Sequence, residues 1–183
     1  TLYGEQEASY VTVRGIPVIY YGSEIGFMRG TAEHKGNRNY YGAERIAVVD
    51  FDVHHGNGTE NILAGDERAL MVSFFQHPFY PYSGDQSPAA NMVNVPVPAY
   101  TKGMEVRELI DIMWMPRLEA FKPEMIFISA GFDAHRDDDM GQMGLTEQDY
   151  AWITRRIKDV AKKYAQGRIV SCLEGGYVMR PLA

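Results

Sequence analysis

Short apolar runs without polar alternation recur through the second part of the chain. They are RIAVVDFD (45–52), RALMVSF (68–74), EMIFISA (124–130) and RIVSCLE (168–174). A run that is apolar on both sides and contains β-branched residues is typical of a strand covered on both faces. The second run is the weakest of the four. Together they predict a buried parallel sheet.

Two segments between these runs show helical spacing instead. In residues 145–167 we expect a helix with Thr146 as its N-cap and Gly167 as its stop. Its apolar positions are Tyr150, Ile153, Ile157, Val160, Ala161 and Tyr164. Residues 103–123 predict a second helix that kinks or restarts at Pro116. Because strands alternate with helices, the predicted fold class is α/β, a parallel sheet flanked by helices.

The segment between residues 76 and 103 follows neither pattern. It holds five prolines and little helical periodicity. We expect long structured loops there, with one edge strand, and such loops are a frequent place for a binding surface.

Composition narrows the class of protein. The 183 residues are enough for one domain with a core, and the net charge of −6 argues against a broad nucleic-acid or anionic-membrane surface. Cys172 is the only cysteine, which excludes an intramolecular disulfide and a cysteine-based zinc cluster. No apolar run approaches the ~20 residues of a membrane span, and we see no signal peptide. We therefore expect a cytoplasmic protein without direct nucleic-acid or membrane partners.

Polar side chains collect where three of the predicted strands end, in DFDVHHGNG, AGFDAHRDD and EGGY. Side chains at positions i and i+2 of an extended segment share a face, so Asp52 and His54 converge, with Asp50 behind them. Asp133 follows another strand, and the carboxyl ends of parallel strands meet at one edge. An Asp/His/Asp set fits zinc and leaves a position open for water or substrate.

The same residues can also be interpreted as purely structural. A D-x-H spacing is common, and a lone histidine near a strand end is more often structural; three polar strand ends give the two readings equal weight. Tyr177 follows Gly175 and Gly176, which allow a sharp bend, and a phenol aimed at a metal-bound carbonyl stabilises an oxyanion. The alternative is a tyrosine that packs a turn.

Three motifs in this order, VVDFDVHHGNGTE, FISAGFDAHRDD and LEGGY, resemble the zinc-dependent histone deacetylase family, in its bacterial and class II branch of deacetylase-amidohydrolases. The resemblance covers residues 44–183. It implies an arginase/deacetylase-like fold and a zinc-dependent hydrolase. The substrates that it implies are acetylated lysine peptides or acetylpolyamines.

The resemblance also implies roles for single residues. Asp52, His54 and Asp133 match the zinc ligands, and Tyr177 matches the transition-state tyrosine. Asp50 matches an acid that orients a catalytic histidine. The supporting positions are Asn57 at the place of a second such acid, Tyr80 and Met140 near the acyl-chain tunnel, His55 as a supporting residue rather than a ligand, and Asp50, His54 and Ser73 at an inner potassium (K⁺) site.

The chain departs from the family pattern upstream of Asp50. The family takes its acid/base from a His-His pair in that region, and no histidine pair precedes Asp50 here. By the resemblance the domain is N-terminally truncated, so we expect impaired activity. The alternatives are a non-catalytic metal-binding protein and a chimeric scaffold.

Residues 11–42 resemble instead the end of the catalytic barrel of α-amylase-family glycoside hydrolases, with RGIPVIYYGSEIG as its last strand and following loop. The implied organisation is a chimera of an amylase-like fragment, residues 1–43, and the C-terminal part of a deacetylase-like domain. The fragment lacks the carboxylate pair that glycoside hydrolysis requires. We hypothesise that residues 16–21 dock beside residues 46–52, and that open strand edges favour a homo-oligomer.

Overall fold

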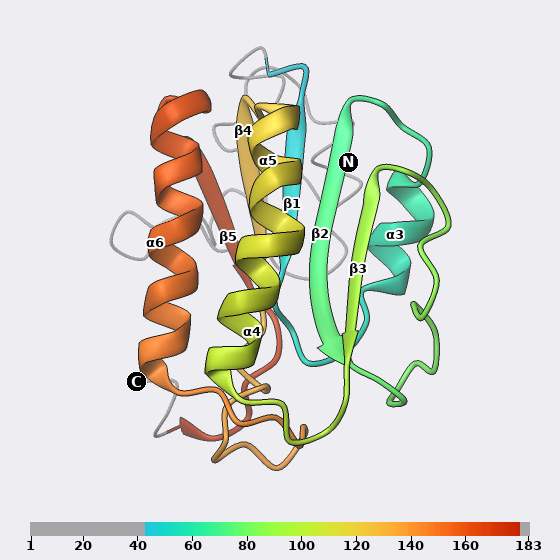
Figure 1. The fold of residues 1–183 in the computed structure, drawn as a ribbon, viewed down its shortest axis with the longest axis vertical. Helices are drawn as coiled ribbons and strands as arrows, with labels where there is room; N and C mark the ends of the chain where they lie inside the picture. Colours follow the sequence, from blue (N-terminus) through green and yellow to red (C-terminus); the bar gives the residue numbers. More distant parts are fainter. Residues whose placement is uncertain (1–42, 180–183) are drawn as a thin grey trace, which may run out of the picture.

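Five parallel strands form the centre of the chain, whose computed structural model describes residues 43–179. The strands are β1 (Ile46–Asp50), β2 (Ala69–Gln76), β3 (Met92–Val97), β4 (Met125–Ala130) and β5 (Ile169–Leu173). They lie in the order β3-β2-β1-β4-β5 (Figure 1). Each of the four predicted runs contains a strand, and β3 is the edge strand expected among the prolines. The prediction of a parallel sheet is confirmed.

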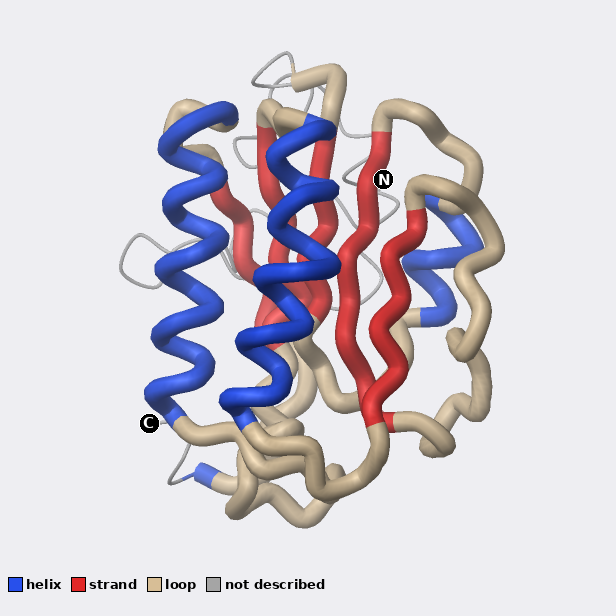
Figure 2. Tube along the Cα trace, viewed as in Figure 1, coloured by secondary structure: helices blue, strands red, loops and turns tan. Residues whose placement is uncertain are grey.

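Helices cover the two faces of this sheet unequally (Figures 1 and 2). One face carries α4 (Gly103–Leu109), the π-helical turn η1 (Ile110–Trp114), α5 (Met115–Phe121) and α6 (Glu147–Tyr164). The other face carries α3 (Asn57–Leu63), whose Leu63 belongs to an apolar cluster with Met71 and Met92. Within residues 43–179, no helix has the length and apolar character needed to cross a membrane.

Alternating side chains of the strands build a core on each face. Val49 and Ile126 belong to the cluster under the helical layer, together with the buried Trp114. Val48 and Phe127 belong to the cluster on the opposite face. Because both faces of β1 and β4 are buried, these strands have no need of a polar side. This explains the continuous apolar runs of the sequence.

The predicted break at Pro116 is a change of helix type. The π-helical turn η1 ends at Trp114, and Pro116 then lies in the first turn of α5. Proline has no N–H to donate, so it interrupts a regular helix but is tolerated in a first turn. Trp114 at this junction is buried and stacks on Phe74, with ring centroids 5.7 Å apart. Packing against the sheet thus holds the junction in place.

The central position of β1 corrects one expectation. Its Asp50 pairs in register with Ser73 of β2 on one side and with Ser129 of β4 on the other. Since both edges of β1 are bonded, no edge is free for another strand, and the hypothesis that residues 16–21 pair beside residues 46–52 is wrong. Residues 16–21 themselves lie outside the described part of the chain.

Asp149 joins the start of α6 to α4. Its Oδ2 accepts hydrogen bonds from the Thr146 backbone N–H at 2.8 Å and from the Thr146 hydroxyl at 2.7 Å, while its Oδ1 lies 2.6 Å from the Arg107 guanidinium. Burial raises the pKa of Asp149, but the bonds from Thr146 and Arg107 outweigh this effect and hold the pKa below its ordinary value. The ionised carboxylate therefore stabilises the fold at neutral pH.

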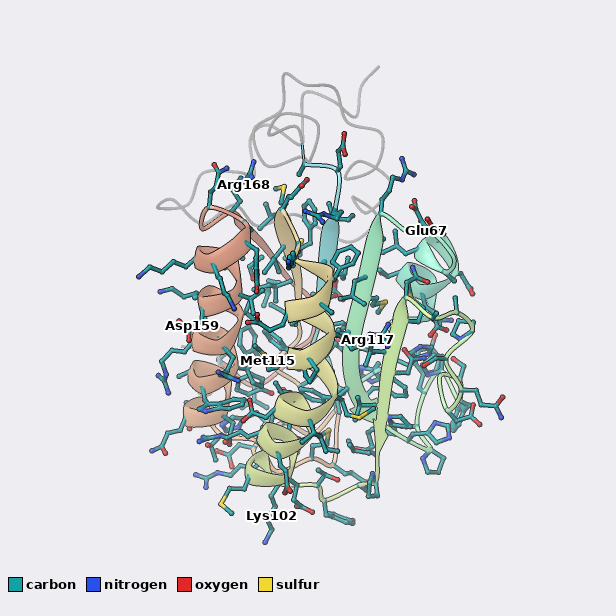
Figure 3. All side chains as sticks on the ribbon, turned by 45° about the horizontal axis from the view of Figure 1, so that its top comes forward. Glu67, Lys102, Met115, Arg117, Asp159 and Arg168 are labelled. Carbon is teal, nitrogen blue, oxygen red and sulfur yellow. The ribbon has the colours of Figure 1, made fainter. Side chains whose placement is uncertain are left out.

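We expect Asp149→Ala to lower the free energy of unfolding by about 1–3 kcal/mol, because it removes a helix cap and leaves a half-buried guanidinium unpaired. Because the pKa is depressed in the folded state, the difference from wild type should shrink as pH falls through that folded-state pKa. Urea unfolding followed by circular dichroism at pH 7 and at acidic pH measures both. Asp159→Ala is the control, since Asp159 is exposed on the outer side of α6 (Figure 3). Equal losses in the two variants would contradict the assignment.

Candidate metal centre

The predicted ligands meet at the carboxyl edge of the sheet, the lower end of the strands in Figure 1. Asp52 and His54 follow β1, and Asp133 follows β4, its hydrogen-bonded neighbour. Each of these three residues offers one potential ligand atom, and the three atoms lie within 4.8 Å of one another. The juxtaposition expected from the strand ends is therefore present.

His54 lies between the two carboxylates. Its Nδ1 is 2.9 Å from Asp52 Oδ1 and 3.3 Å from Asp133 Oδ2. The hydrogen bonds and charges of Asp133 and Asp52 raise the pKa of His54 to about 10, against the opposing effect of burial. The two carboxylates thus favour a positive charge between them, which a protonated imidazole or a metal ion would supply.

The remaining carboxylate atoms are held by backbone groups. Asp133 Oδ1 accepts the Val53 N–H at 2.9 Å, and Asp52 Oδ2 accepts the Gly175 N–H at 3.0 Å. Asp133 Oδ2 is buried and has the His54 imidazole as a polar neighbour, with His54 Nδ1 at 3.3 Å. An oriented carboxylate pair beside one imidazole suits a divalent metal with an open coordination position. The residues present therefore fit a zinc ion.

Two glycines let the backbone approach the carboxylates closely. A Cβ on Gly131 would lie 2.2 Å from Asp52 Oδ2, and a Cβ on Gly175 would lie 2.0 Å from Asp133 Oδ2. Both positions are thus closed to any larger residue unless the ligands move. The sequence showed a bend at Gly175, but the close approach at Gly131 becomes visible only in three dimensions.

Asp50, the last residue of β1, holds the start of this loop. It is 2% exposed, and its Oδ1 accepts the Asp52 N–H at 3.0 Å. Burial, with the nearby charges of Asp52 and Glu174, raises the pKa of Asp50 well above its ordinary value. Ser73, its neighbour on β2, has a buried hydroxyl that bonds to no group within residues 43–179.

Tyr177 follows β5 and borders the same edge. The residue is 61% exposed, and its backbone N–H donates to Asp138 Oδ2 at 2.7 Å. Burial of part of the ring, together with the charges of Asp133 and Asp52, raises the pKa of the Tyr177 phenol. The loop after β5 thus brings Tyr177 to the edge of the sheet that carries the candidate ligands.

Aromatic rings line one side of His54. Phe79 stacks on the imidazole with centroids 5.3 Å apart, and Tyr80 meets it edge-on at 6.1 Å. Tyr80 is 67% exposed and Met140 is 45% exposed, so both are accessible from solvent at this edge. The sequence pointed to Tyr80 but not to Phe79. Two adjacent aromatic residues in a proline-rich loop give no signal about which one faces the site.

His55 and Asn57 lie apart from the cluster. His55 is buried, with Nδ1 3.0 Å from the Ser83 hydroxyl and Nε2 3.2 Å from Glu60 Oε2. Its ring thus connects the loop after β1 with α3 and with the loop after β2. Asn57 begins α3 and is exposed.

A parallel α/β sheet with a carboxylate–imidazole–carboxylate cluster at its carboxyl edge defines a class of protein with a candidate catalytic metal centre. Comparison with known families makes the class specific: the histone deacetylase domain matches residues 31–183. The chain belongs to this family, whose members are hydrolases. The predicted resemblance to deacetylases is thereby confirmed.

Individual relatives agree with this assignment. The type-2 histone deacetylase 2 of Dictyostelium discoideum is 46% identical over 153 residues, which cover 74% of this chain and 9% of that protein. The histone deacetylase-like amidohydrolase of Pseudomonas aeruginosa is 36% identical over 151 residues, covering 75% of this chain and 38% of that one. The crystal structure of the HDA15 HD domain has a TM-score of 0.71 at 32% identity, over 78% of this chain and 42% of its own. The arginase/deacetylase-like fold is confirmed, and the chain spans less than half of each relative.

Proposed function

We propose that this chain carries the metal centre of a zinc-dependent amidohydrolase that removes acetyl groups from acetyl-lysine peptides or acetylpolyamines. The observation that carries the proposal is the convergence of Asp52, His54 and Asp133 within 4.8 Å at the carboxyl edge. The relative from Pseudomonas aeruginosa, named an amidohydrolase, supports the same class of reaction.

A small number of residues would carry out this reaction. Asp52, His54 and Asp133 would hold zinc, which when bound polarises a carbonyl and lowers the pKa of a water molecule. The water oxygen would bond to the acetyl carbon and give up a proton, the C–N bond would break, and the amine nitrogen would take up that proton, so that acetate and a free amine leave. Tyr177 would donate its phenolic proton in a hydrogen bond to the developing oxyanion. Phe79 and Tyr80 would flank the apolar stem of the substrate.

The residues proposed for this reaction do not include a general base. A general base must lie within hydrogen-bond reach of the water, directly or through another water molecule. No histidine pair precedes Asp50, and Asn57 carries no charge. We therefore propose that this chain by itself hydrolyses amides slowly, at the rate that a metal and an oxyanion donor can support without a histidine base.

We also propose an inner potassium site beneath the metal centre. Ser73 supports it, because its buried hydroxyl has no hydrogen-bond partner in the described residues and lies in register with Asp50. Oxygen ligands from Asp50, from the hydroxyl of Ser73 and from the backbone near His54 would suit a hard monovalent cation. Such an ion would offset the raised pKa of Asp50 by stabilising its charged form.

The amylase-like origin of residues 1–43 stays a proposal, as does the boundary at residue 44. Residues 1–42 lie outside the described part of the chain, and the family match begins at residue 31. Self-association is likewise a proposal. Its support is that β3 and β5 are the edge strands of the sheet within residues 43–179.

Tyr177→Phe tests the proposed chemistry. We expect kcat on an acetyl-lysine peptide to fall about 100-fold with little change in KM, because the phenol acts on the transition state and not on the bound substrate. The measurement is steady-state release of acetate by the zinc-loaded chain. Tyr82→Phe removes another exposed phenol and should leave the rate unchanged. A Tyr177→Phe variant as active as wild type would exclude the oxyanion role.

A further inference from the structure

The loop that carries Tyr177 is anchored at its start but needs a second anchor beyond Gly176. The Glu174 N–H donates to Ala130 O at 3.1 Å, and Gly175 O accepts the Phe132 N–H at 2.8 Å. These bonds tie the start of the loop to the chain after β4. Gly176 follows with φ of 125°, a backbone conformation that glycine adopts readily. Because glycine is so permissive, other contacts have to set the direction of Tyr177.

Asp138 provides that second anchor. Its side chain is buried at 6% exposure in the middle of three consecutive aspartates, whose other two members are exposed. Asp138 Oδ2 accepts the backbone N–H of Tyr177 at 2.7 Å and that of Val178 at 3.2 Å. Asp138 Oδ1 accepts the N–H of Met140 at 2.9 Å. One carboxylate thus joins the loop after β5 to the loop after β4.

A side chain with two acceptor oxygens satisfies this arrangement. Three backbone N–H groups converge on Asp138, and a carboxylate offers acceptor positions on both of its oxygens. An asparagine would have to aim its NH₂ group either at Met140 or at Tyr177 and Val178, so donor would face donor. The geometry therefore requires two acceptor oxygens at position 138, whereas Asp139 is exposed.

We propose that Asp138 is a positioning residue that places the Tyr177 phenol over the metal centre; this inference rests on the proposed function. Asp138 accepts from the Tyr177 backbone and acts on the reaction through Tyr177. A displacement of about 1 Å in a reacting group costs about 100-fold in rate, so an anchor at the tyrosine's own N–H controls its contribution.

Binding of a transition-state mimic tests the inference without catalysis. The probe is a trifluoromethyl ketone analogue of an acetyl-lysine peptide, which hydrates to a tetrahedral carbon, titrated by calorimetry into the zinc-loaded full chain. We expect Tyr177→Phe and Asp138→Asn each to weaken binding by about 10- to 100-fold, with zinc content unchanged. The double variant should bind no more weakly than Tyr177→Phe alone, because both substitutions remove one interaction. Asp139→Asn is the matched control and should bind as wild type does.

Amide hydrogen exchange provides a readout that is independent of the probe. In wild type the Tyr177 and Val178 amides should be protected, and in Asp138→Asn both should exchange faster while the amides of β1 keep their rates. If Asp138→Asn does not fold, Asp138→Glu retains the charge and displaces it by one methylene, and the same two amides should lose part of their protection.

The outcomes separate the two proposals. A wild-type chain that binds neither zinc nor the probe contradicts the proposed function, while amides that open on Asp138→Asn still support the anchoring of Tyr177. Unprotected Tyr177 and Val178 amides in wild type overturn the inference. Additive losses of probe binding in the double variant also overturn it, because Asp138 would then act independently of Tyr177.

Discussion

Asp133→Ala is expected to remove zinc from the purified protein, from about one ion per chain to less than about one in ten chains. Asp133 is fully buried and supplies one of the three candidate ligands, and its Oδ2 lies 3.3 Å from His54 Nδ1, another member of the set. With two ligands left, the site can no longer complete a tetrahedral set with one open position. Elemental mass spectrometry of the gel-filtered protein measures the occupancy directly.

The control for this experiment is Asp139→Ala, which removes an exposed carboxylate nine positions after Ala130, the last residue of β4. It should retain the zinc content of wild type. The fold of both variants should be checked by circular dichroism, because Asp133 also accepts the Val53 N–H. A variant that is unfolded would lose zinc whether or not Asp133 is a ligand. Full zinc occupancy in folded Asp133→Ala would show that the metal binds elsewhere.

Gly175→Ala is expected to lower the affinity for zinc by about 100-fold although it changes no ligand. The added Cβ would lie 2.0 Å from Asp133 Oδ2 and 2.7 Å from Asp52 Oδ2, far inside van der Waals contact. One of the two carboxylates must therefore shift. The Gly175 N–H that donates to Asp52 is kept in the variant, so the steric effect is isolated. Competition with a chromophoric chelator measures the affinity.

Gly58→Ala offers a matched comparison. Gly58 lies within α3, and a Cβ there meets no atom within 4 Å. This variant should bind zinc normally and gain about 0.5–1 kcal/mol in stability, because alanine is the better helix former. If Gly175→Ala bound zinc as tightly as Gly58→Ala, the close approach of the backbone would have no role in holding the ligands.

The sequence was sufficient to predict the sheet, because its central strands are buried on both faces and therefore show unbroken apolar runs. It also pointed to the candidate ligands that the structure brings together, since the i, i+2 spacing of Asp52 and His54 and the position of Asp133 follow from strand geometry. The helix α3 was missed, because its seven residues are too few for a helical period to show.

Other parts of the site depend on the path of the backbone. Asp138 stands between two acids of the same type, and only the fold buries it and turns two loops toward it. Phe79 and Tyr80 differ in the same way: one stacks on His54 and the other meets it edge-on. Adjacent residues of like chemistry are equivalent in a sequence, and their contacts separate them.

The carboxyl groups of Asp50, Asp52 and Asp133 lie close together at the candidate metal centre, and this arrangement lowers the stability of the fold. Burial raises the pKa of Asp50 and of Asp133, which means that keeping these carboxyl groups ionised at neutral pH lowers the stability of the folded state. A cation held by these carboxylates would bind the folded state alone and would therefore offset this loss of stability.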